Sequence, residues 1–115
     1  MIKHQIDPDG TEYWYEDKKI HRDNGPAWIQ NNGEEIWHNN DRIHNDHGPA
    51  EILPNGNEHW WKNNEPHRTD GPADICINGQ ENWLKNSSYN RIDGPALISF
   101  TGIQIWYKNG EKTND

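Results

Sequence analysis

The chain has 115 residues, 19 of them acidic and 11 basic, which gives a formal net charge of −8. A chain of this length forms one small domain or one run of short repeats. Ile, Leu, Phe and Val together supply only 17 residues, about 15% of the chain, which excludes a conventional aliphatic core. Seven Trp and four Tyr residues supply apolar area in their place, so we expect a polar fold held together by aromatic side chains.

Cysteine content and charge limit the compartment and the partners. The single cysteine, Cys76, cannot form an internal disulfide, and residues 1–8 contain no apolar segment like that of a secretory signal. We therefore predict a cytoplasmic protein. No apolar run approaches the roughly 18 residues of a membrane-spanning helix, and the acidic balance disfavours nucleic-acid phosphates and anionic membranes. The expected partner is a protein, with no nucleic acid and no membrane insertion.

A 23-residue period runs the length of the chain. Gly-Pro-Ala follows this period, beginning at Gly25, Gly48, Gly71 and Gly94. The same spacing separates the tryptophans Trp14, Trp37, Trp60, Trp83 and Trp106, and the glutamates Glu12, Glu35, Glu58 and Glu81. The period predicts a single repeat domain over residues 1–115. Its five units cover approximately residues 1–22, 23–45, 46–68, 69–91 and 92–115.

Each unit predicts one β-hairpin. A short segment beginning Ala-x-Ile follows Gly-Pro and runs into a turn, and a second, alternating segment ends near the Trp. Asn-Gly occupies the turn at residues 32–33, 55–56 and 78–79, which is the strongest short hairpin signal. Gly and Pro recur too often for a helix to form. We predict an all-β fold of five tandem hairpins, the first and last incomplete, as an elongated, twisted antiparallel sheet or a rolled, solenoid-like meander.

The constant residues decide the register of each hairpin. A two-residue Asn-Gly loop would place the constant Ile and Trp on opposite faces of the sheet. A three-residue loop, with Gly33 in the left-handed conformation, instead pairs Ile29 with Glu35 and Ala27 with Trp37. The Ala, Ile, Glu and Trp of every unit then share one face, which we call the constant face. We therefore predict the three-residue loop.

These units resemble the MORN repeat in its variant forms. The family's units are also about 23 residues long, and residues 106–110 match their aromatic-x-x-Asn-Gly stretch. In place of the family's His-Gly-x-Gly, residues 21–27 and 67–73 read His-Arg-x-x-Gly-Pro-Ala. The resemblance implies two-stranded hairpins in a protein-binding, dimerising or membrane-associated module without catalysis of its own. Such variant units look like those of phage, large-virus and bacterial proteins.

Three rows of side chains could carry chemistry. The Trp row could stack sugars or nucleobases, but its constancy favours a core role. The His-Arg row is the alternative ligand site, and it consists of His21, Arg22, His44, His67, Arg68 and Arg91. Neighbouring copies should lie about 10 Å apart, too far to share a metal with ligands at about 2 Å, so we expect these side chains to bond to nearby Asp or Glu. The evenly spaced Glu row offers no single asymmetric active site. We expect no enzyme, no metal and no cofactor.

The face opposite the Trp row varies between units and is mostly apolar. Its candidate contact residues are Tyr13, Tyr15, Trp28, Ile36, His38, Trp61, Leu84, Ile105 and Tyr107, and it also carries Glu51, His59, Asp74, Asn82 and Leu97. This set, the variable face, is too apolar for a solvated surface. Either the sheet rolls up and buries it, or it is an interface. We predict a non-enzymatic module that binds a protein, either a second copy or, as a small phage or viral factor, a host protein. The alternative is a small-ligand binder that holds a nucleotide or sugar with aromatic and Arg groups.

Overall fold

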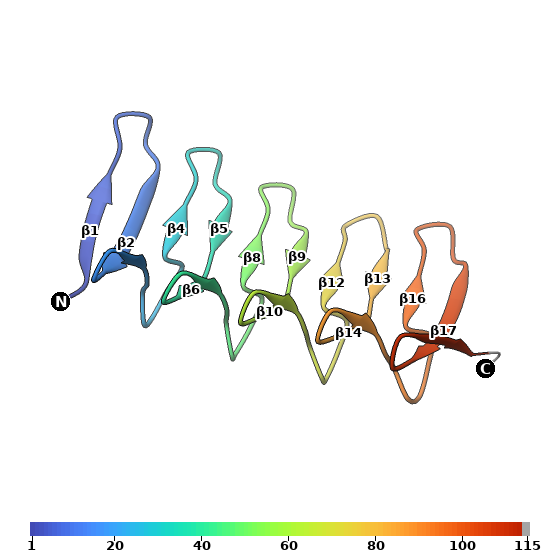
Figure 1. The fold of residues 1–115 in the computed structure, drawn as a ribbon. Coiled ribbons are helices and arrows are strands. Elements are labelled where there is room, and N and C mark those ends of the chain that lie inside the picture. Colours follow the sequence, from blue (N-terminus) through green and yellow to red (C-terminus); the bar gives the residue numbers. More distant parts are fainter. Residues whose placement is uncertain (114–115) are drawn as a thin grey trace.

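The computed structural model describes residues 1–113, none of which is helical. Five long hairpins lie side by side along the molecule (Figure 1). Their strands are β1 (Lys3–Ile6) and β2 (Glu12–Glu16), β4 (Trp28–Ile29) and β5 (Glu35–Ile36), β8 (Glu51–Ile52) and β9 (Glu58–His59), β12 (Asp74–Ile75) and β13 (Glu81–Asn82), and β16 (Leu97–Ile98) and β17 (Gln104–Lys108). These strands form one antiparallel sheet in chain order, which confirms the all-β fold of tandem hairpins.

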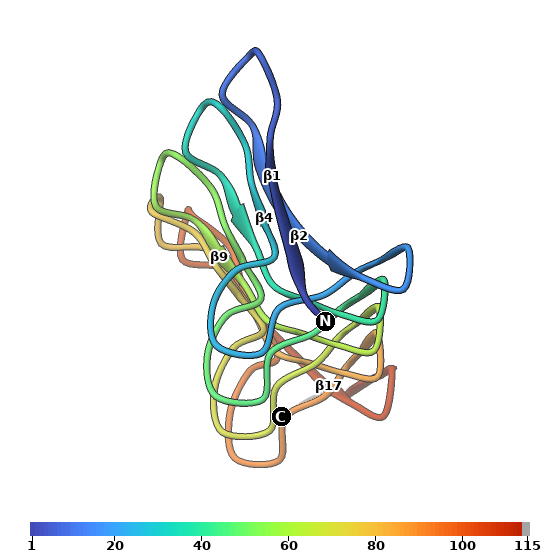
Figure 2. The same ribbon diagram turned by 90° about the vertical axis from the view of Figure 1, so that its left-hand side faces the viewer.

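The sheet stays open and elongated. The molecule measures 51 × 25 × 17 Å along its principal axes, close to the length expected for ten strands spaced about 4.8 Å apart. Seen along the long axis, the long hairpins, a set of short hairpins and the Gly-Pro turns project in three different directions (Figure 2). The extended form of the predicted sheet is therefore correct, and the rolled form is wrong.

The predicted hairpin register is confirmed at Ile29 and Glu35 but not at Ala27 and Trp37. The Ala27 N–H donates to the Ile36 carbonyl, and the Trp37 N–H donates to the Ala50 carbonyl. Ile29 pairs with Glu35, and the later hairpins repeat this pairing. The Gln30 N–H donates to the Glu34 carbonyl at 2.8 Å, which leaves three residues in the loop. Gly33 has a φ of 96°, a left-handed conformation that glycine adopts without strain. The loop is a three-residue turn with a glycine bulge, and it keeps the constant face aligned from unit to unit.

In the second, third and fourth units the constant Trp marks the point where the chain leaves its long hairpin. The backbone N–H of Trp37 donates to the Ala50 carbonyl of the next unit at 2.6 Å, and its carbonyl accepts from the His44 N–H at 3.0 Å. Trp14, Trp60 and Trp83 make the equivalent pair of bonds. After the Trp the chain turns into a second, short hairpin.

The short hairpins correct the prediction of one hairpin per unit. They pair β2 with β3 (Lys19–Ile20), β6 (His38–Asn39) with β7 (Arg42–Ile43), β10 (Trp61–Lys62) with β11 (Glu65–Pro66), β14 (Leu84–Lys85) with β15 (Ser88–Tyr89), and β17 with β18 (Glu111–Thr113). Their tips use two left-handed residues, such as Asn63 (φ 50°) and Asn64 (φ 67°). Asn64 bonds back to Ile43 of the preceding unit, accepting at its side chain (2.7 Å) and donating from its backbone (3.0 Å). The short hairpins therefore link each unit to its neighbour.

The first and last long hairpins are complete, so the prediction that they would be incomplete is wrong. β1 pairs with β2 over four residues although it lacks a Gly-Pro-Ala start. In this unit His4 takes the place of the constant Ala and stacks on Trp14 with ring centroids 4.2 Å apart. Residues 114–115, the end of the fifth predicted unit, lie outside the described residues.

Within residues 1–113, the buried apolar core consists of four small side chains and of Leu84, a residue of the variable face. The alanines of the four Gly-Pro-Ala segments are fully buried, and these are Ala27, Ala50, Ala73 and Ala96. No large side chain in the described part of the chain is fully buried. Stability therefore depends on large rings packed over small residues rather than on a deep apolar interior.

Candidate binding surfaces

Nine residues of the variable face form a continuous line across the sheet. Each is the direct cross-strand neighbour of the next, in the order Tyr13, Trp28, Ile36, Glu51, His59, Asp74, Asn82, Leu97 and Ile105. The other candidates, Tyr15, His38, Trp61, Leu84 and Tyr107, follow the tryptophans at the start of the short hairpins. The structure therefore brings nine residues of the variable face into one line, whereas His38, Trp61 and the buried Leu84 lie in separate two-stranded sheets.

Aromatic clusters lie at both ends of the variable face. At the amino-terminal end, the Tyr13 ring lies 5.4 Å from Trp28 and 6.0 Å from Tyr15. At the other end, Tyr107 stacks on Tyr89 at 4.9 Å. Sequence reasoning missed Tyr89 because it lies in the unpredicted return strand β15. All four tyrosines and Trp28 are only half-buried, so both clusters retain area that a partner can cover.

The middle of the variable face is polar and acidic. The His59 ring bonds to Asp74 through Nδ1 at 2.7 Å, and Asn82 donates to the same carboxylate at 3.0 Å. The bond to Asp74 raises the pKa of His59. Burial, followed by a side-chain hydrogen bond with Glu34, raises the pKa of Glu51. Carboxylates thus gather between the two apolar ends.

Several polar atoms on this face have no partner. Among residues 1–113, five buried side-chain polar atoms make no hydrogen bond, and three of them belong to the variable face: His38 Nδ1, Trp61 Nε1 and Asn82 Oδ1. Buried polar groups are nearly always paired in proteins. The protein therefore has hydrogen-bonding capacity here that its own chain does not use.

The arginines of the alternative ligand site are used inside the fold. The guanidinium groups of Arg22, Arg68 and Arg91 lie 3.7–3.9 Å over the rings of the Trp in the same unit. Each donates from its Nη1 to the carbonyl of the Pro in its own turn at 3.2 Å. A Cβ placed on Gly71 or Gly94 would approach the guanidinium carbon to 2.6 or 2.5 Å. At Gly25, Gly71 and Gly94 a larger residue is therefore excluded, because the guanidinium lies between the glycine and the Trp ring.

This arrangement, in which an arginine lies between a glycine and a Trp ring, is called the arginine sandwich below. It predicts different outcomes for substitutions at two equivalent glycines. Gly94→Ala should push Arg91 off Trp83 and lower the free energy of unfolding by about 1–2 kcal/mol, the value of a partly desolvated cation–π contact. Gly48→Ala meets only Asn45 at 3.5 Å and should be neutral or stabilise by about 0.4–1 kcal/mol through reduced chain entropy. Urea denaturation of both variants measures the difference. Equal losses would show that the sandwich does not restrict these glycines.

The histidines of the row bond neighbouring units together. The Nδ1 atoms of His21, His44 and His67 accept the backbone N–H of a left-handed Asn in the next unit at 3.0–3.2 Å. Asn90 replaces His in the fourth unit and accepts from Asn109 at 2.9 Å. His21 and His44 also contact the nearby Asp23 and Asp46 through Nε2. These bonds require an unprotonated Nδ1.

We therefore expect His67 to make stability sensitive to acid. Burial, together with Lys62 and Lys85 and partly opposed by Glu65, lowers the pKa of His67. The unfolded chain then takes up a proton more readily, so this contribution to stability is present above the usual His pKa and lost as the pH falls. His67→Asn keeps the bond and should lose less stability than the parent between about pH 7 and 5. The raised pKa of His59 gives stability the opposite dependence on pH. Because both proteins contain His59, this contribution cancels in the comparison. Urea denaturation across this range measures it, and parallel pH profiles would contradict the assignment.

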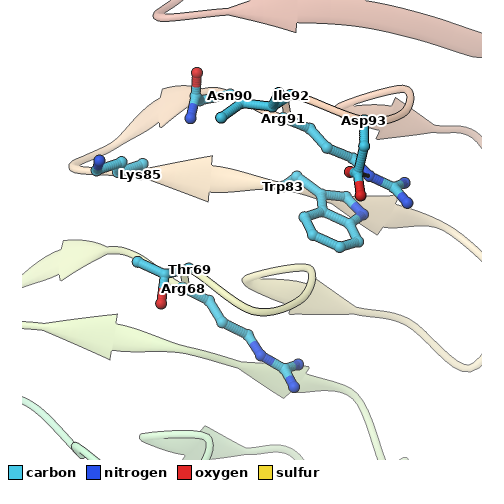
Figure 3. Close-up of a pocket in the computed structure, with 8 residues that line it drawn as sticks. All are labelled: Arg68, Thr69, Trp83, Lys85, Asn90, Arg91, Ile92 and Asp93. Carbon is cyan, nitrogen blue, oxygen red and sulfur yellow. Dashed lines mark hydrogen bonds and ion pairs between the residues drawn. The ribbon is translucent and has the colours of Figure 1, made fainter.

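Clefts separate successive Gly-Pro turns. Figure 3 shows one of about 330 Å³, in which the Arg91 guanidinium lies beside the Trp83 ring and Asp93. The cleft also contacts Arg68 and Thr69 of the preceding turn. No residue of the variable face lines it, whereas the corresponding clefts of the second and third units also contact His38 and Trp61.

No helix of the described chain is long and apolar enough to cross a membrane. Within residues 1–113, no group of three or more His, Cys, Asp or Glu side chains is placed to hold a metal ion. Comparison with models of protein families, with curated proteins and with solved structures gives no match.

Proposed function

We propose that this protein is a non-enzymatic repeat module that binds another protein, or a second copy of itself, through the variable face. The observation that carries this proposal is the continuous cross-strand line from Tyr13 to Ile105. Its positions vary between units, so the repeat fold does not require apolar residues there. Half-buried aromatic rings at both ends are the residue types that dominate protein interfaces.

The length and charge of this face favour a protein over a small molecule. The molecule is 51 Å long, and two apolar clusters flank a middle that carries Glu51 and Asp74. An extended surface of this kind contacts a partner at several points, whereas a small-ligand site is a single deep pocket. The resemblance to MORN repeats also supports a protein-binding module.

Two matched pairs of substitutions test the proposal. Tyr15→Ser and Tyr107→Ser remove one ring from each end of the face, while Ile92→Ser and Phe100→Ser remove residues that are 84% and 66% exposed elsewhere. We expect the Tyr variants to weaken self-association or partner binding by about 2 kcal/mol each, and the controls to leave it unchanged. Sedimentation velocity measures self-association, and titration calorimetry measures binding of a protein captured from the native cell. Loss of binding in the controls, with none in the Tyr variants, would overturn the proposal.

A further inference from the structure

The second unit lacks the arginine sandwich of its neighbours. Asn45 stands where the first, third and fourth units have Arg, and His47 stands where the third and fourth have Asp70 and Asp93. The Asn45 Nδ2 still donates to the Pro49 carbonyl at 3.0 Å, as the arginines do in their own turns. Its short side chain carries no cation over the Trp37 ring.

An open cleft of about 440 Å³ lies beside Trp37. Asn45, Gly48 and Ile52 line it from the same and the following hairpin, and Asp23 and Asn24 line it from the preceding turn. Gly48 is partly exposed, whereas Gly25, Gly71 and Gly94 are buried under their arginines. The shortened side chain therefore leaves accessible the surfaces that a guanidinium covers in the other units.

We propose that the Trp37 cleft binds an arginine side chain presented by a partner protein. The other units show how such a guanidinium would lie, flat between the Trp ring and the glycine. The Pro49 carbonyl has a second lone pair to accept a donor, and the Asp23 carboxylate is 76% exposed at the edge of the cleft. A guanidinium suits this site better than an ammonium because it is planar, stacks on indole and is weakly hydrated. This site goes beyond the proposed function, because it lies on the opposite side of the sheet from the variable face.

The test is a titration with arginine whose amino and carboxyl groups are blocked by acetyl and methylamide groups. The probe should shift the Trp37 indole N–H resonance in a saturable way, with a Kd on the order of millimolar. The double variant Asn45→Arg, His47→Asp places the chain's own arginine in the cleft, so it should lose the response and gain thermal stability. The reverse variant, Arg91→Asn with Asp93→His, should gain a saturable response at Trp83.

Three results would overturn the proposal. These are a parent that gives no saturable shift, a parent that responds equally to blocked lysine, and a response that survives in the Asn45→Arg, His47→Asp variant. Tighter binding of free arginine than of the blocked residue would identify a small-molecule ligand and overturn the assignment to a protein side chain. Because Asn45 and His47 lie outside the variable face, self-association of the double variant reports separately on the proposed function.

Discussion

Trp60→Ala should lower the free energy of unfolding by about 3–5 kcal/mol, the cost of emptying a large aromatic site. Trp60 lies in the central unit, where the Arg68 guanidinium stacks 3.7 Å from its ring centroid. Its removal leaves the Arg68 cation without its aromatic partner. Urea denaturation followed by far-ultraviolet circular dichroism measures the loss.

Ile92→Ala is the control for this substitution. Ile92 is 84% exposed, so its truncation should change stability by no more than about 0.5 kcal/mol. A loss at Trp60 no larger than that of the control would show that the Trp row is not the core.

Ala50→Leu should destabilise the protein by about 1–3 kcal/mol, because a larger side chain does not fit a well-packed site. Ala50 is fully buried on the constant face, bonded through its backbone to Trp37 and His59. Glu51→Leu adds the same side chain at the next residue, on the variable face. Burial already raises the pKa of Glu51, so its replacement by Leu should be neutral or stabilising. Thermal and urea melts of the pair measure the difference, and equal losses would mean that the two faces are wrongly assigned.

Much of the sheet could be predicted because local and repeated signals agree. The Asn-Gly turns fixed the hairpin positions, and the shared face of Ala, Ile, Glu and Trp selected the three-residue loop, which Gly33 confirms with its φ of 96°. A one-residue slip would have moved the constant set to both faces. The variable face followed directly from the same register.

The short hairpins were not predicted, although Asn109 and Gly110 at the last tip form an Asn-Gly turn with both residues left-handed. Asp17 and Lys18 occupy left-handed conformations at one tip, and Lys is not a residue that favours them. The second short hairpin is held by the preceding unit instead, since the Asp41 side chain and backbone bond to Ile20 across the repeat boundary. Such turns depend on neighbours about one period away, which a local pattern does not report.

The chemistry of the turns was only partly visible in the sequence. Bonds from the His-Arg row to turn aspartates were predicted, and Arg68 does contact Asp70 at 3.0 Å. The stacking of each Arg on a Trp eight residues earlier was not, because it needs the short hairpin to fold the chain back. Once this stacking of Arg on Trp is known, Asn45 is seen to stand where the first, third and fourth units have Arg. The cleft beside Trp37 therefore differs from the clefts in those units.

The most direct test of the division between a structural and a binding face is site-specific photo-crosslinking. One protein carries p-benzoylphenylalanine in place of Trp28 on the variable face, and the other carries it in place of Ile92 on the turn side. The arrangement predicts covalent adducts, with a second copy or a captured protein, from position 28 and none from position 92. Adducts from position 92 in preference to position 28 would contradict it and place the binding surface on the Gly-Pro turns.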